Sequence, residues 1–213
     1  MVRIELQLAD KAEWSEIFDR QGFTVFVSHE APPAAGERVR LDLTVGAGGP
    51  RVILRGDVLS RAFADAGRPG FTLKLGRYER EKVNYLAGFV RGGMLDLREM
   101  RRLPIRLPVA CRSEVGSRAG HTRDINEAGL FVVDEHPFPE ETDVQIELGV
   151  PGRGEPIALV GRVSHTVLVE DEDVPGMGIR LELSEAARAE LKGVVDELER
   201  RFSIGDLPEE AIQ

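Results

Sequence analysis

ERVRLDLTV, residues 37–45, alternates polar and apolar side chains from Arg38 onward, and TDVQIELGV, residues 142–150, repeats the pattern from Asp143. Apolar residues at every second position are typical of a half-buried strand, because successive side chains of a strand point to opposite faces. Val39 and Val144 hold the same place in the two stretches and lie 105 positions apart. The chain therefore contains two copies of one strand, which predicts two copies of a larger unit.

The repeat continues on both sides of these strands. RGDVLS, residues 55–60, matches VGRVSH, residues 160–165, at the same spacing, and Gly22-Phe23 matches Gly129-Leu130 at a spacing of 107. Such small drifts indicate short insertions in turns, where they are tolerated. Glycine and proline separate the alternating segments, as expected between antiparallel strands. We therefore predict a mainly β protein of two small antiparallel β-barrels, split barrels in form, each followed by a C-terminal α-helix.

Apolar residues at helical spacing follow the strands of each repeat. The first stripe lies within residues 83–90, the second within residues 191–202, and Ser184 is a predicted N-cap of the second helix. A strand at residues 2–8 and a short helix from Asp10 are predicted at the amino terminus, with Trp14, Ile17 and Phe18 facing inward. The expected domains are a barrel at 1–91, a linker at 92–101 around Gly92 and Gly93, a barrel with its helix at 102–204, and a flexible tail at 205–213.

Composition narrows the class of protein. The 213 residues are 42% apolar and 31% charged, which is ordinary for globular domains. No apolar run approaches the roughly 18–20 residues that span a bilayer, and Met1–Glu5 lacks the apolar run of a signal peptide. Cys111 is the single cysteine, so neither an internal disulfide nor a thiolate metal site is expected. We predict a cytoplasmic protein that does not insert into a membrane and uses no metal or other cofactor.

Charge is distributed unevenly along the chain. The net charge of −9 disfavours general binding to DNA, yet residues 98–123 hold seven arginines against two acids. Arg102 and Arg106 flank Pro104, which forbids a continuous helix, so both lie on a turn or an extended segment. Guanidinium groups bind phosphate through paired donors and stack on purines. A compact phosphorylated ligand is therefore expected here.

A loop about twenty residues later has complementary chemistry. In Asp124-Ile125-Asn126-Glu127-Ala128-Gly129 the carboxylate of Asp124 can accept from the N–H groups of a guanine edge. The amide of Asn126 can donate and accept, and Gly129 permits close approach of the backbone. The arginine segment and this loop together predict a site for a phosphorylated guanine ligand.

These motifs make the second repeat resemble the PilZ domains, which bind the bacterial second messenger cyclic di-GMP. Arg102 and Arg106 match the Arg-x-x-x-Arg turn of that family, with Arg101 as the extra arginine before it, and Asp124 and Gly129 match the Asp/Asn-x-Ser-x-x-Gly motif. The likeness covers roughly residues 98–202. It implies a nucleotide-binding signal-transduction protein of bacteria whose ligand contacts are the residues named here: Arg101, Arg102, Arg106, Asp124, Asn126 and Gly129. Asn126 departs from the serine of the family.

The first repeat looks like the same barrel in degenerate, PilZ-like form, because Ile17, Asp19 and Gly22 match Asp124, Asn126 and Gly129 and only Arg3 lies upstream. The predicted function is a cyclic di-GMP effector that relays binding to an unidentified protein partner by rearranging its domains, and a homodimer is possible. The alternative is a nucleotide-independent PilZ-like adaptor, which Asn126 favours. A single-stranded nucleic-acid binder is disfavoured because residues 98–123 contain no aromatic side chain for stacking. The sequence contains no phosphate loop, dinucleotide fingerprint or nucleophile elbow, so no enzymatic activity is expected.

Overall fold

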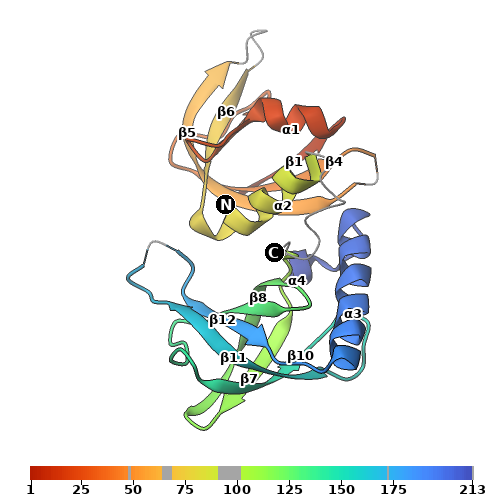
Figure 1. Ribbon diagram of the computed structural model, residues 1–213. Coiled ribbons are helices and arrows are strands. Elements are labelled where there is room, and N and C mark those ends of the chain that lie inside the picture. The colour runs from red at the N-terminus through yellow and green to blue at the C-terminus, as the bar shows by residue number, and fades with distance from the viewer. Residues whose placement is uncertain (48, 64–68, 91–101, 172, 213) are drawn as a thin grey trace. The chain divides into compact units, whose positions relative to one another are not determined.

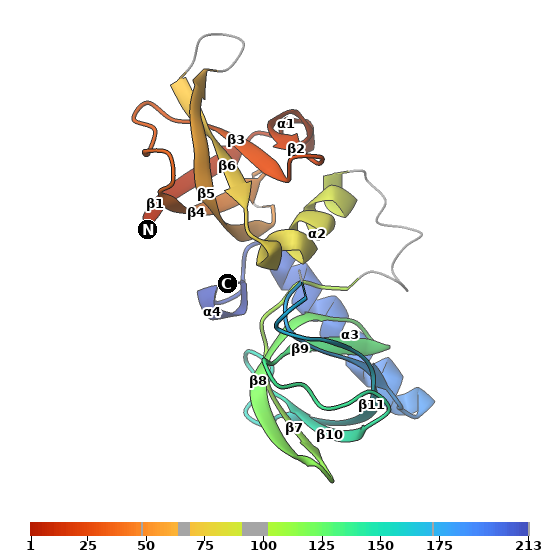
Figure 2. The ribbon, with the colours of Figure 1, turned by 90° about the vertical axis from the view of Figure 1, so that its left-hand side faces the viewer.

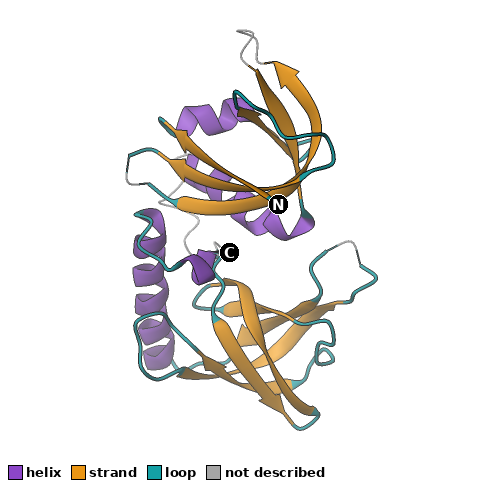
Figure 3. Ribbon diagram, turned by 180° about the vertical axis from the view of Figure 1, so that it is seen from behind, coloured by secondary structure: helices purple, strands orange, loops and turns teal. Residues whose placement is uncertain are grey.

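The computed structural model describes residues 1–47, 49–63, 69–90, 102–171 and 173–212. The chain divides into two compact units, Met1–Leu95 with Ser203–Gly205, and Asp96–Phe202 with Asp206–Gln213. The predicted linker at 92–101 lies outside the described residues, as does Arg101. Each unit is built mainly from strands, as Figure 3 shows, and each is described by itself.

The second unit is a closed six-stranded barrel with the neighbour order β10-β11-β12-β9-β8-β7, and every neighbouring pair is antiparallel (Figure 2). Along β10, Val144, Ile146 and Leu148 are buried while the residues between them are exposed, as the alternation predicted. Burial of each such side chain contributes roughly 1.5–3 kcal/mol. The bounds of its strands are β7 (Pro108–Ser113), β8 (Gly116–Ile125), β9 (Gly129–Val133), β10 (Asp143–Leu148), β11 (Ile157–Val167) and β12 (Gly176–Leu181).

The first unit is a six-stranded sheet with the order β1-β4-β5-β6-β3-β2 (Figure 1). Its strands are β1 (Val2–Leu8), β2 (Phe18–Asp19), β3 (Thr24–Ser28), β4 (Arg38–Val45), β5 (Arg51–Phe63) and β6 (Pro69–Leu75). One pair differs from the predicted antiparallel arrangement, because β1 runs parallel to β4. Helix α1 (Lys11–Ile17) separates β1 from β2, where the second unit has the direct β7–β8 hairpin. The terminal strands β1 and β2 are not paired with each other in the described sheet.

The two units nevertheless repeat one strand order. In chain order, strands β1 to β6 occupy the same places in their sheet as strands β7 to β12 occupy in the barrel. This correspondence confirms the repeat predicted from the sequence. The ladder of β5 with β6 shifts register between Val58 and Ser60, and that of β11 with β12 shifts between Val163 and His165. Both irregularities lie at the predicted spacing of 105 residues. A β-bulge bends the strand that carries it, so both sheets bend at the same place.

The helices follow the predicted periodicity. Asp10 caps α1 by accepting from the backbone N–H groups of Ala12 and Glu13 at 2.7 and 3.2 Å, and Trp14 is buried. A single 3-10 turn, η1 (Arg77–Glu79), leads into α2 (Arg80–Val90), which buries Val83 and Leu86. Helix α3 (Glu185–Ser203) buries Leu191, Val195, Leu198 and Phe202. None of the described helices combines the length and apolar character needed to cross a bilayer.

The carboxy-terminal residues differ from the predicted flexible tail at 205–213. Residues Glu209–Ile212 form helix α4, in which Ala211 and Ile212 are buried. The Ala211 carbonyl accepts from the backbone N–H of Arg106 at 2.8 Å. The tail is therefore tied to the arginine segment of the second unit, a contact that its polar composition concealed.

Candidate ligand site

The arginine segment, residues 102–107, lies extended along strand β8. Leu103 and Ile125 form an isolated antiparallel bridge, with N–H to O distances of 2.8 and 3.0 Å. The hydroxyl of Thr122 donates to the Ile105 carbonyl and accepts from the Leu107 N–H, which fastens the far end of the segment. Leu103, Ile105 and Leu107 are buried, whereas Arg106 is exposed and Arg102 partly so. The alternation thus anchors the segment while it keeps both arginines at the surface.

Arg102 meets the predicted loop directly. Its Nη1 donates to Oδ1 of Asp124 at 2.8 Å, across 22 positions of sequence. A Cβ placed on Gly129 would lie 3.3 Å from Nη2 of Arg102 and 2.5 Å from the Ile179 carbonyl oxygen. Glycine is therefore required for the backbone to pass between these two groups. The structure thus brings Arg102, Asp124 and Gly129 together.

The Asp124 carboxylate is fully buried and carries two ion pairs. Its side chain is 0% exposed, with Arg102 on Oδ1 and Nε of Arg123 on Oδ2 at 2.7 Å. The ladder of β8 with β9 shifts register between Thr122 and Asp124, so Arg123 occupies a bulge. A bulge re-aims a side chain and allows consecutive residues to serve one site. Both carboxylate oxygens are occupied by guanidinium groups, so neither is open to a ligand in this state.

Arg123 is held from a second side by an aromatic ring. Its guanidinium carbon lies 3.8 Å from the centroid of Phe131, close enough for a cation–π contact. Phe131 is fully buried, and the ring of His165 lies on it at 5.9 Å between centroids. Arg123 was counted within the arginine-rich stretch, but sequence reasoning did not place it in the site. The signal was its position immediately before Asp124.

The side chain of Asn126 holds the loop in a turn. Its Oδ1 accepts from the N–H groups of Ala128 and Gly129 at 3.1 and 2.9 Å, and the residue is 5% exposed. A side-chain oxygen that binds the backbone two and three residues ahead forms an Asx turn. Asn126 thus closes the loop through its side-chain oxygen.

Arg106 lies at the other end of the arginine segment beside His121. Burial, and then the charge of Arg106, lower the pKa of His121 from its ordinary value. The imidazole is therefore neutral at pH 7 and adds no charge to the site. Pro108, two residues after Arg106, pairs with His121 on β8, so Arg106 lies beside this strand.

The first unit has the same turn without the arginine network. Oδ1 and Oδ2 of Asp19 accept from Gln21 and Gly22 at 3.0 and 2.9 Å, as Asn126 does for Ala128 and Gly129. Arg3, the upstream arginine of this unit, is bound instead to Asp42. Position 17, which matches Asp124, holds isoleucine. The structure keeps the loop in both units and the ion pairs in one.

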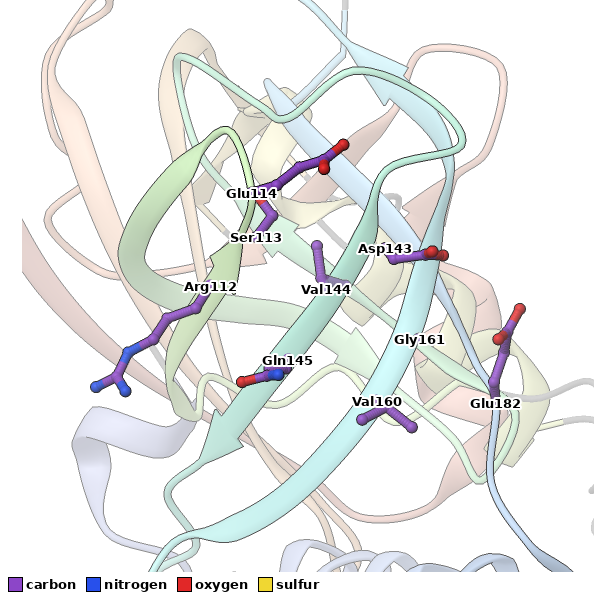
Figure 4. A pocket seen from close by; sticks show the side chains of 9 residues that line it. All are labelled: Arg112, Ser113, Glu114, Asp143, Val144, Gln145, Val160, Gly161 and Glu182. Atoms are coloured by element: carbon purple, nitrogen blue, oxygen red, sulfur yellow. The ribbon is translucent and has the colours of Figure 1, made fainter.

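A surface cleft of about 420 Å³ lies elsewhere on the second unit (Figure 4). Its lining includes Glu114, Asp143 and Glu182, and Arg112 extends away from these carboxylates. Such a rim repels phosphate, so the cleft is a poor candidate for the predicted ligand. Among the described residues no cluster of three histidine, cysteine or acidic side chains has an arrangement suited to a metal ion.

The comparison with protein families now decides the identity of the second unit. The sequence model of the PilZ domain matches residues 96–197. This segment is a PilZ domain. Its barrel, its arginine segment and its loop from Asp124 to Gly129 lie within that match. The resemblance to PilZ domains that the sequence motifs indicated is therefore confirmed.

Solved structures of PilZ proteins resemble the chain at low identity. The PilZ domain of CeSA from a cellulose-synthesizing bacterium is 22% identical, with 46% of this chain and 97% of that chain covered and a TM-score of 0.38. The inhibitor of motility MotI/DgrA of Bacillus subtilis is 12% identical, with 84% and 85% covered and a TM-score of 0.39. The PilZ domain of YcgR from Escherichia coli, solved with c-di-GMP, is 17% identical, with 47% and 92% covered and a TM-score of 0.35. No curated protein sequence matches the chain significantly.

Proposed function

We propose that this protein is a cyclic di-GMP effector whose PilZ domain binds the nucleotide through Arg102, Arg106, Asp124, Asn126 and Gly129, with Arg101 as an additional contact. The observation that carries the proposal is the ion pair between Arg102 and Asp124 at 2.8 Å, directly over Gly129. It joins the two halves of the motif that are far apart in sequence. We infer a binding role, not a catalytic one.

Each of these side chains suits a different part of the ligand. Arg102 and Arg106 supply guanidinium donors for the two phosphodiester groups. The Asp124 carboxylate supplies acceptors for guanine N–H groups once a guanidinium has left it. Asn126 is compatible with binding, because its side-chain oxygen closes the turn, as a serine oxygen at this position can. This arrangement favours the sensor over the nucleotide-independent adaptor.

Calorimetric titration of the full chain with cyclic di-GMP tests the proposal. The wild type is expected to bind, and Arg102→Ala and Arg106→Ala are expected to weaken binding at least tenfold. Arg118→Ala is the matched control, because Arg118 also lies on β8 but is bound to the His136 carbonyl and to the Phe138 ring. Cyclic di-AMP is expected not to compete. Equal heats for wild type and both arginine variants would support the adaptor instead.

We further propose that binding is relayed from the PilZ domain to a protein partner through the first unit, which keeps the sheet but lacks the arginine network. Ligand binding shifts a conformational equilibrium only if it favours one state over another. Small-angle scattering of free and nucleotide-bound protein should therefore give different profiles. Superimposable profiles would argue against this relay and leave the binding proposal standing.

A further inference from the structure

We propose that Arg123 is a positioning residue, a role that rests on the proposed function. Arg123 is the fixed counter-charge that allows Arg102 to leave Asp124 and bind a ligand phosphate. Arg123 thereby makes Asp124 available to the guanine edge without leaving a buried carboxylate uncompensated. The family motifs matched above do not include this position.

The two arginines that share Asp124 are held very differently. Arg102 is 33% exposed and reaches the carboxylate by a single Nη1 contact from the end of the extended segment. Arg123 is 18% exposed, is bonded through Nε, and is stacked on Phe131. The stack and the Nε bond fix Arg123, whereas Arg102 can rotate outward.

Burial of Asp124 makes a remaining partner necessary. A fully buried carboxylate that loses its cation has a large desolvation penalty and takes up a proton instead. With Arg123 retained on Oδ2, the departure of Arg102 from Oδ1 leaves the charge compensated. Oδ1 is then open to accept from guanine N–H groups, and Arg102 is free for phosphate. The exchange of partners needs no proton.

Other charged groups stand near this network. Asp173 lies 3.9 Å from Nη1 of Arg123, Arg106 lies beside His121, and His165 lies against Phe131. Burial and the charge of Arg106 lower the pKa of His121, and a bound anion would act in the opposite direction, so the wild type can itself take up a proton on binding. The meaningful quantity is therefore the difference in proton uptake between a variant and the wild type.

The experiment is calorimetric titration with cyclic di-GMP in buffers of different ionisation enthalpy, which counts the protons taken up per nucleotide. Arg123→Gln is expected to take up close to one more proton than wild type on binding and to bind roughly tenfold more weakly. Arg123→Lys keeps a cation and should show no extra proton. Arg118→Gln is the control, since Arg118 shares the strand, the residue type and an aromatic contact.

The double variant Arg123→Gln/Asp124→Asn removes the carboxylate that would be protonated, so the extra proton should disappear. Arg123→Gln itself should fold, because Arg102 still pairs with Asp124 in the free protein. A variant that fails to fold would make Arg123 a residue of stability and overturn its proposed role. A proton count equal to wild type in Arg123→Gln, or an extra proton that persists in the double variant, overturns the role of Arg123. Absence of binding by the wild type overturns the proposed function itself, and the role with it.

Discussion

Removal of the Asn126 side chain should destabilise the PilZ domain more than removal of Asp19 destabilises the first unit. Both residues close the same turn, but Asn126 is buried and its bond to Gly129 is inaccessible to water, whereas the Asp19 bonds are exposed. A buried N–H that loses its acceptor costs about 1–3 kcal/mol. An exposed N–H finds water instead, and surface substitutions usually change stability by less than about 0.5 kcal/mol. We expect about 2 kcal/mol for Asn126→Ala.

The distribution of aromatic residues allows the two units to be followed separately. The chain has one tryptophan and two tyrosines, Trp14, Tyr78 and Tyr85, and all three lie in the first unit. Tryptophan fluorescence therefore reports unfolding of that unit, and far-ultraviolet circular dichroism reports both. With a urea dependence of roughly 1–3 kcal/mol per molar, Asn126→Ala should shift the dichroism transition of the PilZ domain by about 1 M. The fluorescence transition should not move.

Asn126→Ser supplies the decisive comparison, because a serine oxygen can accept from the same backbone N–H groups. It should recover at least half of the stability lost in Asn126→Ala. The predicted difference is refuted if Asn126→Ala changes the free energy of unfolding of the PilZ domain by less than about 0.5 kcal/mol. It is also refuted if Asp19→Ala destabilises the first unit by as much as Asn126→Ala destabilises the PilZ domain.

Three further predictions concern titratable groups. Burial alone would raise the pKa of Asp42, but Arg40 and Arg3 outweigh it and hold the pKa below its ordinary value. The stability that Arg3 adds should therefore be present above about pH 4 and vanish as pH falls through the lower folded value, measured as the shrinking difference between wild type and Arg3→Ala by fluorescence. Arg106→Ala should raise the pKa of His121, followed by NMR titration; an unchanged value would separate the two residues. Burial raises the pKa of Cys111 to about 12, so its thiol should resist iodoacetamide at pH 8 until the barrel unfolds, and rapid labelling of native protein would contradict its burial.

Sequence reasoning predicted the strands well because alternation is a local property. The pattern in residues 37–45 and 142–150 specifies which side chains face inward, and the structure buries them accordingly. Alternation does not specify the direction of a neighbouring strand, so the parallel pairing of β1 with β4 was not predicted. That direction depends on α1, which leads the chain away from β1 instead of turning back in a hairpin.

The site was predicted in its parts but not in its connections. The order of arginines, acid and glycine indicated which segments meet, since the motif itself specifies residue types. The bulge at Arg123 depends on how β8 pairs with β9, a long-range feature that no local pattern encodes. Full burial of Asp124 likewise results from the segment 102–107 lying along β8. A residue expected to read a base is therefore found holding two arginines.

Comparison of the two units separates what the fold requires from what it does not. Both units keep the strand order, the bulge and the Asx turn, so the turn-closing oxygens of Asp19 and Asn126 are explained by the fold. The first unit builds the same strand order with Ile17 where the PilZ domain has Asp124, and its own buried carboxylate, Asp42, pairs with Arg3 and Arg40 elsewhere in the sheet. A buried carboxylate with two guanidinium groups has a desolvation cost that apolar residues avoid. Since the strand order forms with isoleucine at this position, the fold does not require the network of Arg102, Asp124 and Arg123, which is what the proposed ligand site predicts.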